Sequence, residues 1–359
     1  MRITFNQKDL KDSLADILAI VHESSLTQLS RALKLETDHD VVHAYLGNGE
    51  TYIKQAIPGT VILPGTCILN GNYLHELVKN LSSAELVELI FEQNRLVVKQ
   101  RGLRYKIPTI LPDNFWQFQP VGEDEYTAIN PEALVECIGA VTYAISKDTP
   151  KPMANILIEP SANGKIRAVG CDGIRLALHN AIGVVNRSML LSASNAKALK
   201  KYLSDKEELA MFADGSLVHL LTPSGFLKMR SSSQTYVDYR SAIPQGPYKS
   251  IAFKTEDLRL TLMRTLLFKS DNPIITMEVS PDVLRIELIN KEGEGLETLG
   301  IESDIKDPIS ICINPRYLME ILEHMKDAPL KIRYYGKDRP LVITDDVDSL
   351  TLLTQVSTK

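Results

Sequence analysis

A pattern that recurs three times along the chain limits the possible fold more than any other feature. A short apolar strand pattern leads into an amphipathic helix pattern at RITFNQKDL, at YTAINPEAL and at SIAFKTEDL. The equivalent leucine in the three helices is Leu10, Leu134 or Leu258, and both intervals are 124 residues. Constant spacing of this kind indicates tandem copies of one structural unit.

Each copy holds a second strand–helix pattern near its middle, at TCILNGNYL, MLLSASNAK and ISICINPRY. Equivalent apolar residues in these helices are spaced by 122 residues: Leu77, Leu199 and Ile321. An asparagine is expected to cap each helix, because its side chain can accept a hydrogen bond from a first-turn amide: Asn72, Asn195 and Asn314. The two spacings predict three domains, over residues 1–122, 125–246 and 248–359.

The segments after each helix have the composition of short strands joined by tight turns. AELVELIFEQNRLVVKQRGLRYKIP and ELAMFADGSLVHLLTPSGFLKMR are two examples. We therefore expect an α+β fold in which each domain packs two helices on antiparallel sheets. Because every copy shares one plan, edge strands of neighbouring copies can pair, and closing such an array into a ring removes the exposed edges.

Composition narrows the class of protein further. The chain has 359 residues with a net charge of −5, and it contains no long apolar run and no signal-peptide pattern at its start. The four cysteines show no CxxC spacing, which argues against a zinc site and fits a reducing compartment. We expect a cytoplasmic protein without membrane contact. A tight duplex-DNA binder is usually basic, so any DNA contact is expected to be weak, local or topological.

Sequence motifs of catalysis are missing from this chain. It has no phosphate-binding glycine loop, no GxSxG and no HExxH. The pair His39 and His43 lies in a strand and turn pattern, and the Asp345–Asp348 run is typical of a solvated turn. We expect no catalytic residue, no metal and no cofactor. The alternative is an enzyme, such as a nuclease, whose site forms only in the folded chain, and metal-dependent cleavage of duplex DNA would reveal it.

The predicted helices are slightly richer in Lys and Arg than in Asp and Glu, whereas the rest of the chain is acidic. Basic residues form a stripe on the helix near residue 200, and others occur on the helix from 254, while Lys79 and Lys201 occupy equivalent places in two copies. Such a stripe is also typical of a solvated helix face. If these helices line a pore, they would touch phosphates without reading bases; the candidates are Lys79, Lys197, Lys201 and Arg259.

Three local motifs, together with the repeat, resemble the beta subunit of bacterial DNA polymerase III, the sliding clamp family. The first is Asp172-Gly173-Ile174-Arg175-Leu176 within AVGCDGIRLAL. The second is TYVDYRSAIP near residue 240, and the third is INPRYL, with Asn314 and Tyr317. The resemblance covers the whole chain, because the tripled strand–helix plan does.

The resemblance implies a non-enzymatic ring of clamp domains around duplex DNA, closed by a head-to-tail homodimer of domain one against domain three. It implies that polymerase and clamp-loader subunits bind a pocket through short hydrophobic peptides. The pocket candidates carried over are Met153, Asp172, Gly173, Ile174, Arg175, Leu176, Val237, Ala242, Asn314, Tyr317, Thr354 and Gln355. A structural salt bridge is the alternative role for Arg175. The loop that contacts DNA in relatives corresponds to Lys147 and Lys151.

The helix predicted to begin near residue 254 indicates which residues of domain three contact the second protomer. Leu258 and Leu262 already form its apolar stripe, so one of Leu266 and Leu267 is surplus to the domain's own core. Tyr105 and Ile107, on the last predicted strand of domain one, are the matching candidates.

This chain also departs from the family pattern. Polar Thr354 and Gln355 stand where an apolar tail is expected, Val237 replaces a proline, and Glu23 falls where many relatives carry an arginine. The alternative function is a scaffold of the same fold that binds partner peptides but does not encircle DNA.

Overall fold

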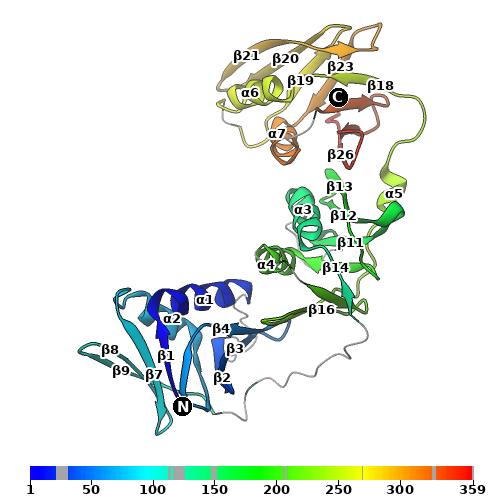
Figure 1. The fold of residues 1–359 in the computed structure, drawn as a ribbon. Coiled ribbons are helices and arrows are strands. Elements are labelled where there is room, and N and C mark those ends of the chain that lie inside the picture. Colours follow the sequence, from blue (N-terminus) through cyan, green and yellow to red (C-terminus); the bar gives the residue numbers. More distant parts are fainter. Residues whose placement is uncertain are drawn as a thin grey trace. The chain divides into compact units, whose positions relative to one another are not determined.

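The computed structural model describes residues 1–21, 31–111, 115, 126–146, 152–204, 207, 209–268, 270–325 and 329–357. These residues form an α+β architecture in which every strand ladder is antiparallel (Figure 1). Their contacts define two compact units, residues 1–132 with 185–232, and residues 133–184 with 233–359. The expected middle domain contributes to both units. No helix of the described residues is long and apolar enough to span a membrane.

The first unit contains two sheets. One has the order β5-β1-β7-β8-β9, with strands β1 (Arg2–Asn6), β5 (Thr60–Leu63), β7 (Leu86–Glu92), β8 (Arg95–Gln100) and β9 (Leu103–Pro108). The other has the order β10-β15-β16-β17-β4-β3-β2-β6. Its strands are β2 (Ala32–Asp38), β3 (Val41–Gly47), β4 (Thr51–Ile57), β6 (Thr66–Asn70), β10 (Thr127–Ala128), β15 (Ala210–Ala213), β16 (Leu217–Thr222) and β17 (Gly225–Arg230).

Three helices pack in this first unit: α1 (Gln7–Ile20), α2 (Gly71–Lys79) and α4 (Ala193–Leu203), the last of which follows β14 (Met189–Ser192). Helices α1 and α2 lie side by side, and α1 also contacts α4. Leu10, Leu14 and Ile17 of α1 are fully buried. Their spacing places one apolar stripe of the helix against the core, as the sequence predicts.

The second unit also contains two sheets. The larger runs β11-β12-β13-β26-β25-β24-β18-β22 and the smaller β21-β20-β19-β23. The larger comprises β11 (Asn155–Ser161), β12 (Lys165–Cys171), β13 (Arg175–Ile182), β18 (Lys249–Ala252), β22 (Glu302–Ser303), β24 (Lys331–Tyr334), β25 (Leu341–Thr344) and β26 (Ser349–Leu353). The smaller comprises β19 (Ile275–Val279), β20 (Val283–Asn290), β21 (Gly293–Gly300) and β23 (Ile309–Ile313). The helices are α3 (Pro131–Val141), α5 (Tyr239–Ala242), α6 (Thr255–Thr265) and α7 (Pro315–His324), and α6 packs on α7.

The six strand–helix pairs expected from the repeat are confirmed. They are β1–α1, β6–α2, β10–α3, β14–α4, β18–α6 and β23–α7. The anchor leucines Leu10, Leu134 and Leu258 are at most 1% exposed. The repeated sequence pattern therefore corresponds to a repeated structural pattern that buries the same helix position each time.

Helix capping differs from expectation in two of the three second helices. Asn314 caps α7 as predicted, but Asn70 caps α2 and Ser192 caps α4. The expectations for Asn72 and Asn195 are wrong, because each strand runs directly into its helix and the last strand residue reaches the first-turn amides. Asn195 is buried inside α4, where its amide donates to the Arg230 carbonyl at 3.0 Å.

Each unit contains one ladder that joins two of the expected copies. In the first unit β4 pairs with β17, and in the second β13 pairs with β26. The registers are equivalent, since Ile53 faces Leu227, and Ala177 faces Thr351, with both members shifted by 124 residues. We call these the β4·β17 and β13·β26 junctions. By order along the chain, β21 of the third copy corresponds to β4 and β13, and β9 of the first copy corresponds to β17 and β26. These two strands form no such junction within the described residues, and each lies at the edge of its sheet.

Candidate partner-binding site

The turn between β12 and β13 is held in one shape by a single carboxylate. Asp172 Oδ1 accepts hydrogen bonds from the backbone amides of Ile174 at 2.8 Å and Arg175 at 2.6 Å. Gly173 has φ +89°, a conformation that residues with a side chain rarely adopt. Open space surrounds the position of a Cβ there, so backbone conformation alone accounts for the glycine. The DG motif therefore builds a fixed, exposed turn.

Arg175 begins β13 and is 7% exposed. Its Nε and Nη2 donate to Asp172 Oδ2 at 3.1 and 2.9 Å, Nη2 also donates to the Tyr143 carbonyl at 3.0 Å, and Nη1 donates to Glu320. The guanidinium lies 4.5 Å from the ring centre of Tyr317 and 5.5 Å from that of Tyr143. Burial lowers the pKa of Arg175, but its hydrogen bonds to Glu320 and Asp172 outweigh that effect and raise the pKa. Arg175 thus makes the salt bridges given above as its alternative role.

An apolar cluster lies beside this turn. Its buried members are Val169, Cys171, Leu176, Leu178, Tyr239, Val342 and Leu352. Partly exposed side chains packed on it include Met153, Tyr236, Val237, Ile243 and Tyr335. The cluster therefore brings together three of the predicted pocket residues, Leu176, Met153 and Val237. Ala242, at the end of α5, is exposed and outside the cluster.

The chain beyond β26 forms a tail that is tied down on both sides. The Thr354 amide donates to the Ile174 carbonyl at 3.0 Å, and the Val356 amide donates to the Cys312 carbonyl at 2.7 Å. Gln355 Nε2 donates to the carbonyls of Gly336 at 2.8 Å and Arg339 at 2.6 Å. The polar side chain that departs from the family pattern therefore anchors the tail to the loop between β24 and β25.

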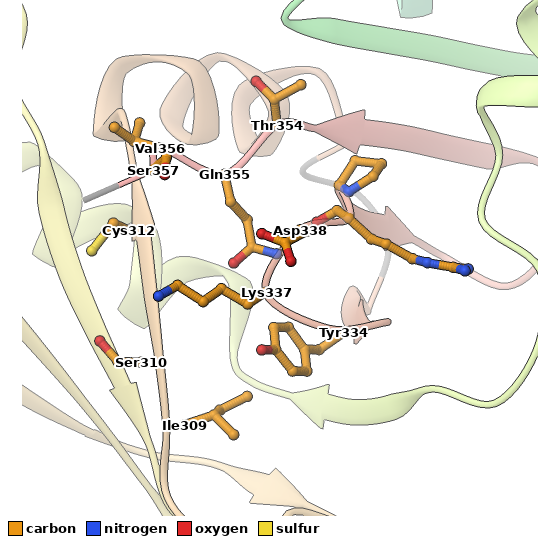
Figure 2. Close-up of a pocket in the computed structure, with 12 residues that line it drawn as sticks. Ile309, Ser310, Cys312, Tyr334, Lys337, Asp338, Thr354, Gln355, Val356 and Ser357 are labelled. Atoms are coloured by element: carbon orange, nitrogen blue, oxygen red, sulfur yellow. Dashed lines mark hydrogen bonds between the residues drawn. The ribbon is translucent and has the colours of Figure 1, made fainter. Parts of the chain in front are cut away.

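A cavity of about 610 Å³ lies on one side of this tail. Figure 2 shows Thr354 and Gln355 on one side of it and Tyr334 and Ile309 on the other, with Lys337 reaching between them. Of the predicted pocket residues, Thr354 and Gln355 line this cavity, and those of the turn and the apolar cluster do not. The tail therefore contacts the turn and also lines a separate cavity.

The third motif positions α7 against Arg175. The Asn314 side chain accepts from the Arg316 amide at 3.0 Å, which fixes the start of the helix. One turn later Tyr317 lies under the guanidinium, and Glu320 follows at the next turn. No sequence motif marks Glu320, although its spacing of three residues from Tyr317 places both on one helix face. Tyr335 and Ile243 were also missed, since they pack on an apolar cluster whose members are far apart in the sequence.

Four of the predicted DNA-facing residues lie on helices. Lys79 ends α2, Lys197 and Lys201 lie on α4, and Arg259 lies on α6. The three lysines are exposed. Lys201 pairs with Asp16 at 3.2 Å, and Lys79 and Arg259 each pair with a glutamate on their own helix. Lys147, Lys151 and Glu23 lie outside the described residues.

The predicted dimer residues differ in exposure. On β9, Tyr105 is 47% exposed and Ile107 is 7% exposed. After α6, Leu266 packs against the core of the second unit, whereas Leu267 is 77% exposed. The exposed apolar surface at these positions is therefore mostly that of Tyr105 and Leu267.

No metal-ligand cluster of three or more His, Cys, Asp or Glu side chains occurs within the part of the chain that the structure describes. The Asp345 carboxylate instead accepts hydrogen bonds from the amides of Val347, Asp348 and Ser349 at 2.9 to 3.0 Å. The acidic run between β25 and β26 thus shapes a turn.

Comparisons with known proteins agree with this architecture. Residues 240–356 match the family model of the DNA polymerase III beta subunit, C-terminal domain. The beta sliding clamp of Bacillus subtilis is 20% identical and that of Lactococcus lactis 21%, covering 96% and 91% of this chain and 95% and 91% of those proteins. Solved clamps from Bacillus subtilis and Pseudomonas aeruginosa superimpose with TM-scores of 0.91 and 0.90, at 20% and 18% identity, with all of both chains covered. The chain is thus similar over nearly its whole length to beta sliding clamps, and its residues 240–356 match the C-terminal domain of the DNA polymerase III beta subunit.

Proposed function

We propose that this protein is a DNA sliding clamp without catalytic activity, which encircles duplex DNA and tethers DNA polymerase and other partners. Its three domains, residues 1–122, 125–246 and 248–359, would form half of a ring, and a second copy would complete it. The observation that carries the proposal is the repeated junction: two equivalent ladders are made within the chain, and one strand of each kind is left at a sheet edge.

The two edge strands β21 and β9 would pair with each other in the same way as the strands of the internal junctions. At both internal junctions the strand corresponding to β21 pairs with the last strand of the next copy, and β9 is the last strand of the first copy. A head-to-tail contact between β21 of one protomer and β9 of the other would repeat that pairing. With two protomers the contacts close, so no edge of this kind stays exposed.

Charge supports the same pairing. Arg104 and Lys106 lie on β9, whereas Glu294 and Glu297 lie on β21. Opposite charges across a ladder stabilise it, while β9 against β9 or β21 against β21 would place like charges together. The charges therefore favour the head-to-tail arrangement over either like-with-like pairing.

Partner binding is proposed for the turn and apolar cluster of the second unit. The partly exposed Met153 and Val237 offer apolar surface, and the fixed Asp172–Arg175 turn offers exposed backbone groups. A short extended peptide with one hydrophobic anchor suits such a combination. We call this surface the partner groove. Polymerase and clamp-loader subunits are the proposed partners, because relatives are named beta sliding clamps.

The proposal predicts that lysines on the helices hold DNA without reading its sequence. Changing Lys79, Lys197 and Lys201 to glutamate is expected to shorten the lifetime of the clamp on nicked circular DNA about tenfold or more at low salt. Phosphate contacts by such residues are strongly screened, so the difference should shrink as salt rises. Loading by a cognate clamp loader followed by gel filtration of the circular DNA measures the retained protein.

The matched control exchanges three lysines that lie on a strand or in turns and not on helices, Lys99, Lys291 and Lys337. This control variant is expected to stay on DNA as the wild type does. Equal retention of the helix variant and the wild type at low salt would contradict a lysine-lined pore. Absence of the wild-type protein from circular DNA would instead favour a peptide-binding scaffold of the same fold.

A further inference from the structure

The β4·β17 and β13·β26 junctions use different chemistry at equivalent positions. In the first, Thr51, at the start of β4, donates to Asn195 Oδ1 on α4 at 3.1 Å, and both residues are buried. The equivalent residues 124 and 122 positions later are Arg175 and Tyr317, which stack at 4.5 Å. A neutral hydrogen bond thus suffices to join a strand start to the next helix at the first junction. Of the two junctions described, the ionic network occurs at the one that carries the partner groove.

The guanidinium of Arg175 has few hydrogen-bond donors left for a ligand. Its Nε, Nη1 and Nη2 all donate to groups within the second unit, and both aromatic neighbours lie against the guanidinium. A residue that is 7% exposed and bonded on all three nitrogens acts on a peptide through the groups it holds. Arg175 is therefore a link between α7 and the turn.

Glu320 is the member of this network that solvent reaches. Its side chain is 46% exposed, against 7% for Arg175 and 13% for Asp172. An ion pair with one half-exposed partner responds to salt, whereas the buried Arg175–Asp172 pair is shielded. Removing Glu320 leaves the Arg175–Asp172 pair in place, so the fold keeps its buried charge balance.

From Arg175 the contacts continue into the partner groove. Asp172 binds Arg175 with one carboxylate oxygen and holds the amides of the turn with the other. The Ile174 carbonyl in that turn accepts from the Thr354 amide, which fixes the tail. A shift of the guanidinium would therefore move the turn and the tail together.

We propose that Glu320 is a positioning residue of the partner groove. It holds Arg175 from α7, and through Asp172 it keeps the turn and the tail in the shape that receives a partner peptide. This inference rests on the proposed function of the groove. It assigns to α7 a control over partner affinity, although no atom of Glu320 has to touch the peptide.

Calorimetry with the synthetic peptide Gln-Ala-Ala-Leu-Phe tests the assignment. Glu320→Met is expected to weaken binding about five- to tenfold, as the loss of one charge-assisted hydrogen bond implies. Glu320→Gln keeps an acceptor oxygen, so its affinity for the peptide should lie between those of the wild type and Glu320→Met. Glu323→Gln, on the same helix and exposed, is the control and should bind like the wild type. Raising the salt should weaken binding to the wild type and leave Glu320→Met nearly unchanged.

Amide hydrogen exchange separates positioning from simple loss of stability. In Glu320→Met, the amides of Ile174, Arg175 and Thr354 should exchange faster, while amides in β11 and β19 stay as in the wild type. Unchanged exchange at those three amides, or unchanged peptide affinity at both salt concentrations, would overturn the assignment. If the wild type does not bind the peptide, the groove's proposed function fails, and the exchange measurement alone then decides whether Glu320 positions the turn.

Discussion

Replacing Tyr105 and Leu267 together by alanine is expected to convert the proposed dimer into folded monomers. Both side chains are exposed in the single chain, at 47% and 77%, and they lie on or beside the proposed contact of domain one with domain three. Burying one such side chain contributes about 1.5–3 kcal/mol. Because about half of Tyr105 and three quarters of Leu267 remain to be buried, the two substitutions remove about 2–4 kcal/mol from each of the two junctions of the ring, or roughly one and a half to three decades in each junction's affinity.

Sedimentation velocity across a range of protein concentrations measures this effect. The matched control is Ile62→Ala on β5, an apolar residue that is 53% exposed at the opposite edge of the same sheet as β9. It should leave the dimer intact. A Tyr105→Ala, Leu267→Ala variant that stays dimeric at nanomolar concentration would show that the protomers meet elsewhere.

Arg175→Met is expected to lower the free energy of unfolding by about 3–5 kcal/mol. The substitution leaves the mostly buried Asp172 carboxylate without its cation and takes away the group that joins α7, the Tyr143 carbonyl and the turn. Breaking a buried ion pair from one side costs about that much, because the remaining charge is desolvated and unpaired. Urea unfolding followed by circular dichroism gives the difference.

Arg285→Met provides the comparison for that measurement. Arg285 and Glu278 are about half exposed and lie 3.9 Å apart, a surface pair that contributes about 0–1 kcal/mol. If Arg175→Met unfolds at the same urea concentration as Arg285→Met, the network around Arg175 does not stabilise the fold, and the physical account of the turn is wrong.

The sequence repeat predicted much of the fold because its constant spacing marks the residues that are buried in each copy. Leucines at constant spacing mark the helix position that faces the core, and a strand end fixes where each helix begins. The caps at Asn72 and Asn195 were wrong for a local reason. Several polar residues lie within three positions of each strand end, and backbone geometry, which spacing does not report, decides which one reaches the first-turn amides.

The site was predictable only in part. The DG turn follows from its own residues, since the aspartate and the glycine act within five positions. Leu176, Met153 and Val237 followed from the resemblance, and the apolar cluster groups them. The roles of Glu320 and Gln355 could not be read from the sequence, because their partners lie on other elements. Glu320 meets Arg175 only when β13 pairs with β26. Gln355 meets the Gly336 and Arg339 carbonyls only when β26 pairs with β25, beside the loop between β24 and β25.

The lifetimes of the loaded protein on circular and on linear DNA of one length show whether the protein is linked to DNA by topology. A ring held by topology stays on a closed circle and slides off free ends, whatever the weakness of its phosphate contacts. We predict retention on the nicked circle and rapid loss after a single restriction cut, in physiological salt. Equal lifetimes on the two forms, or no association with either, would contradict a sliding clamp.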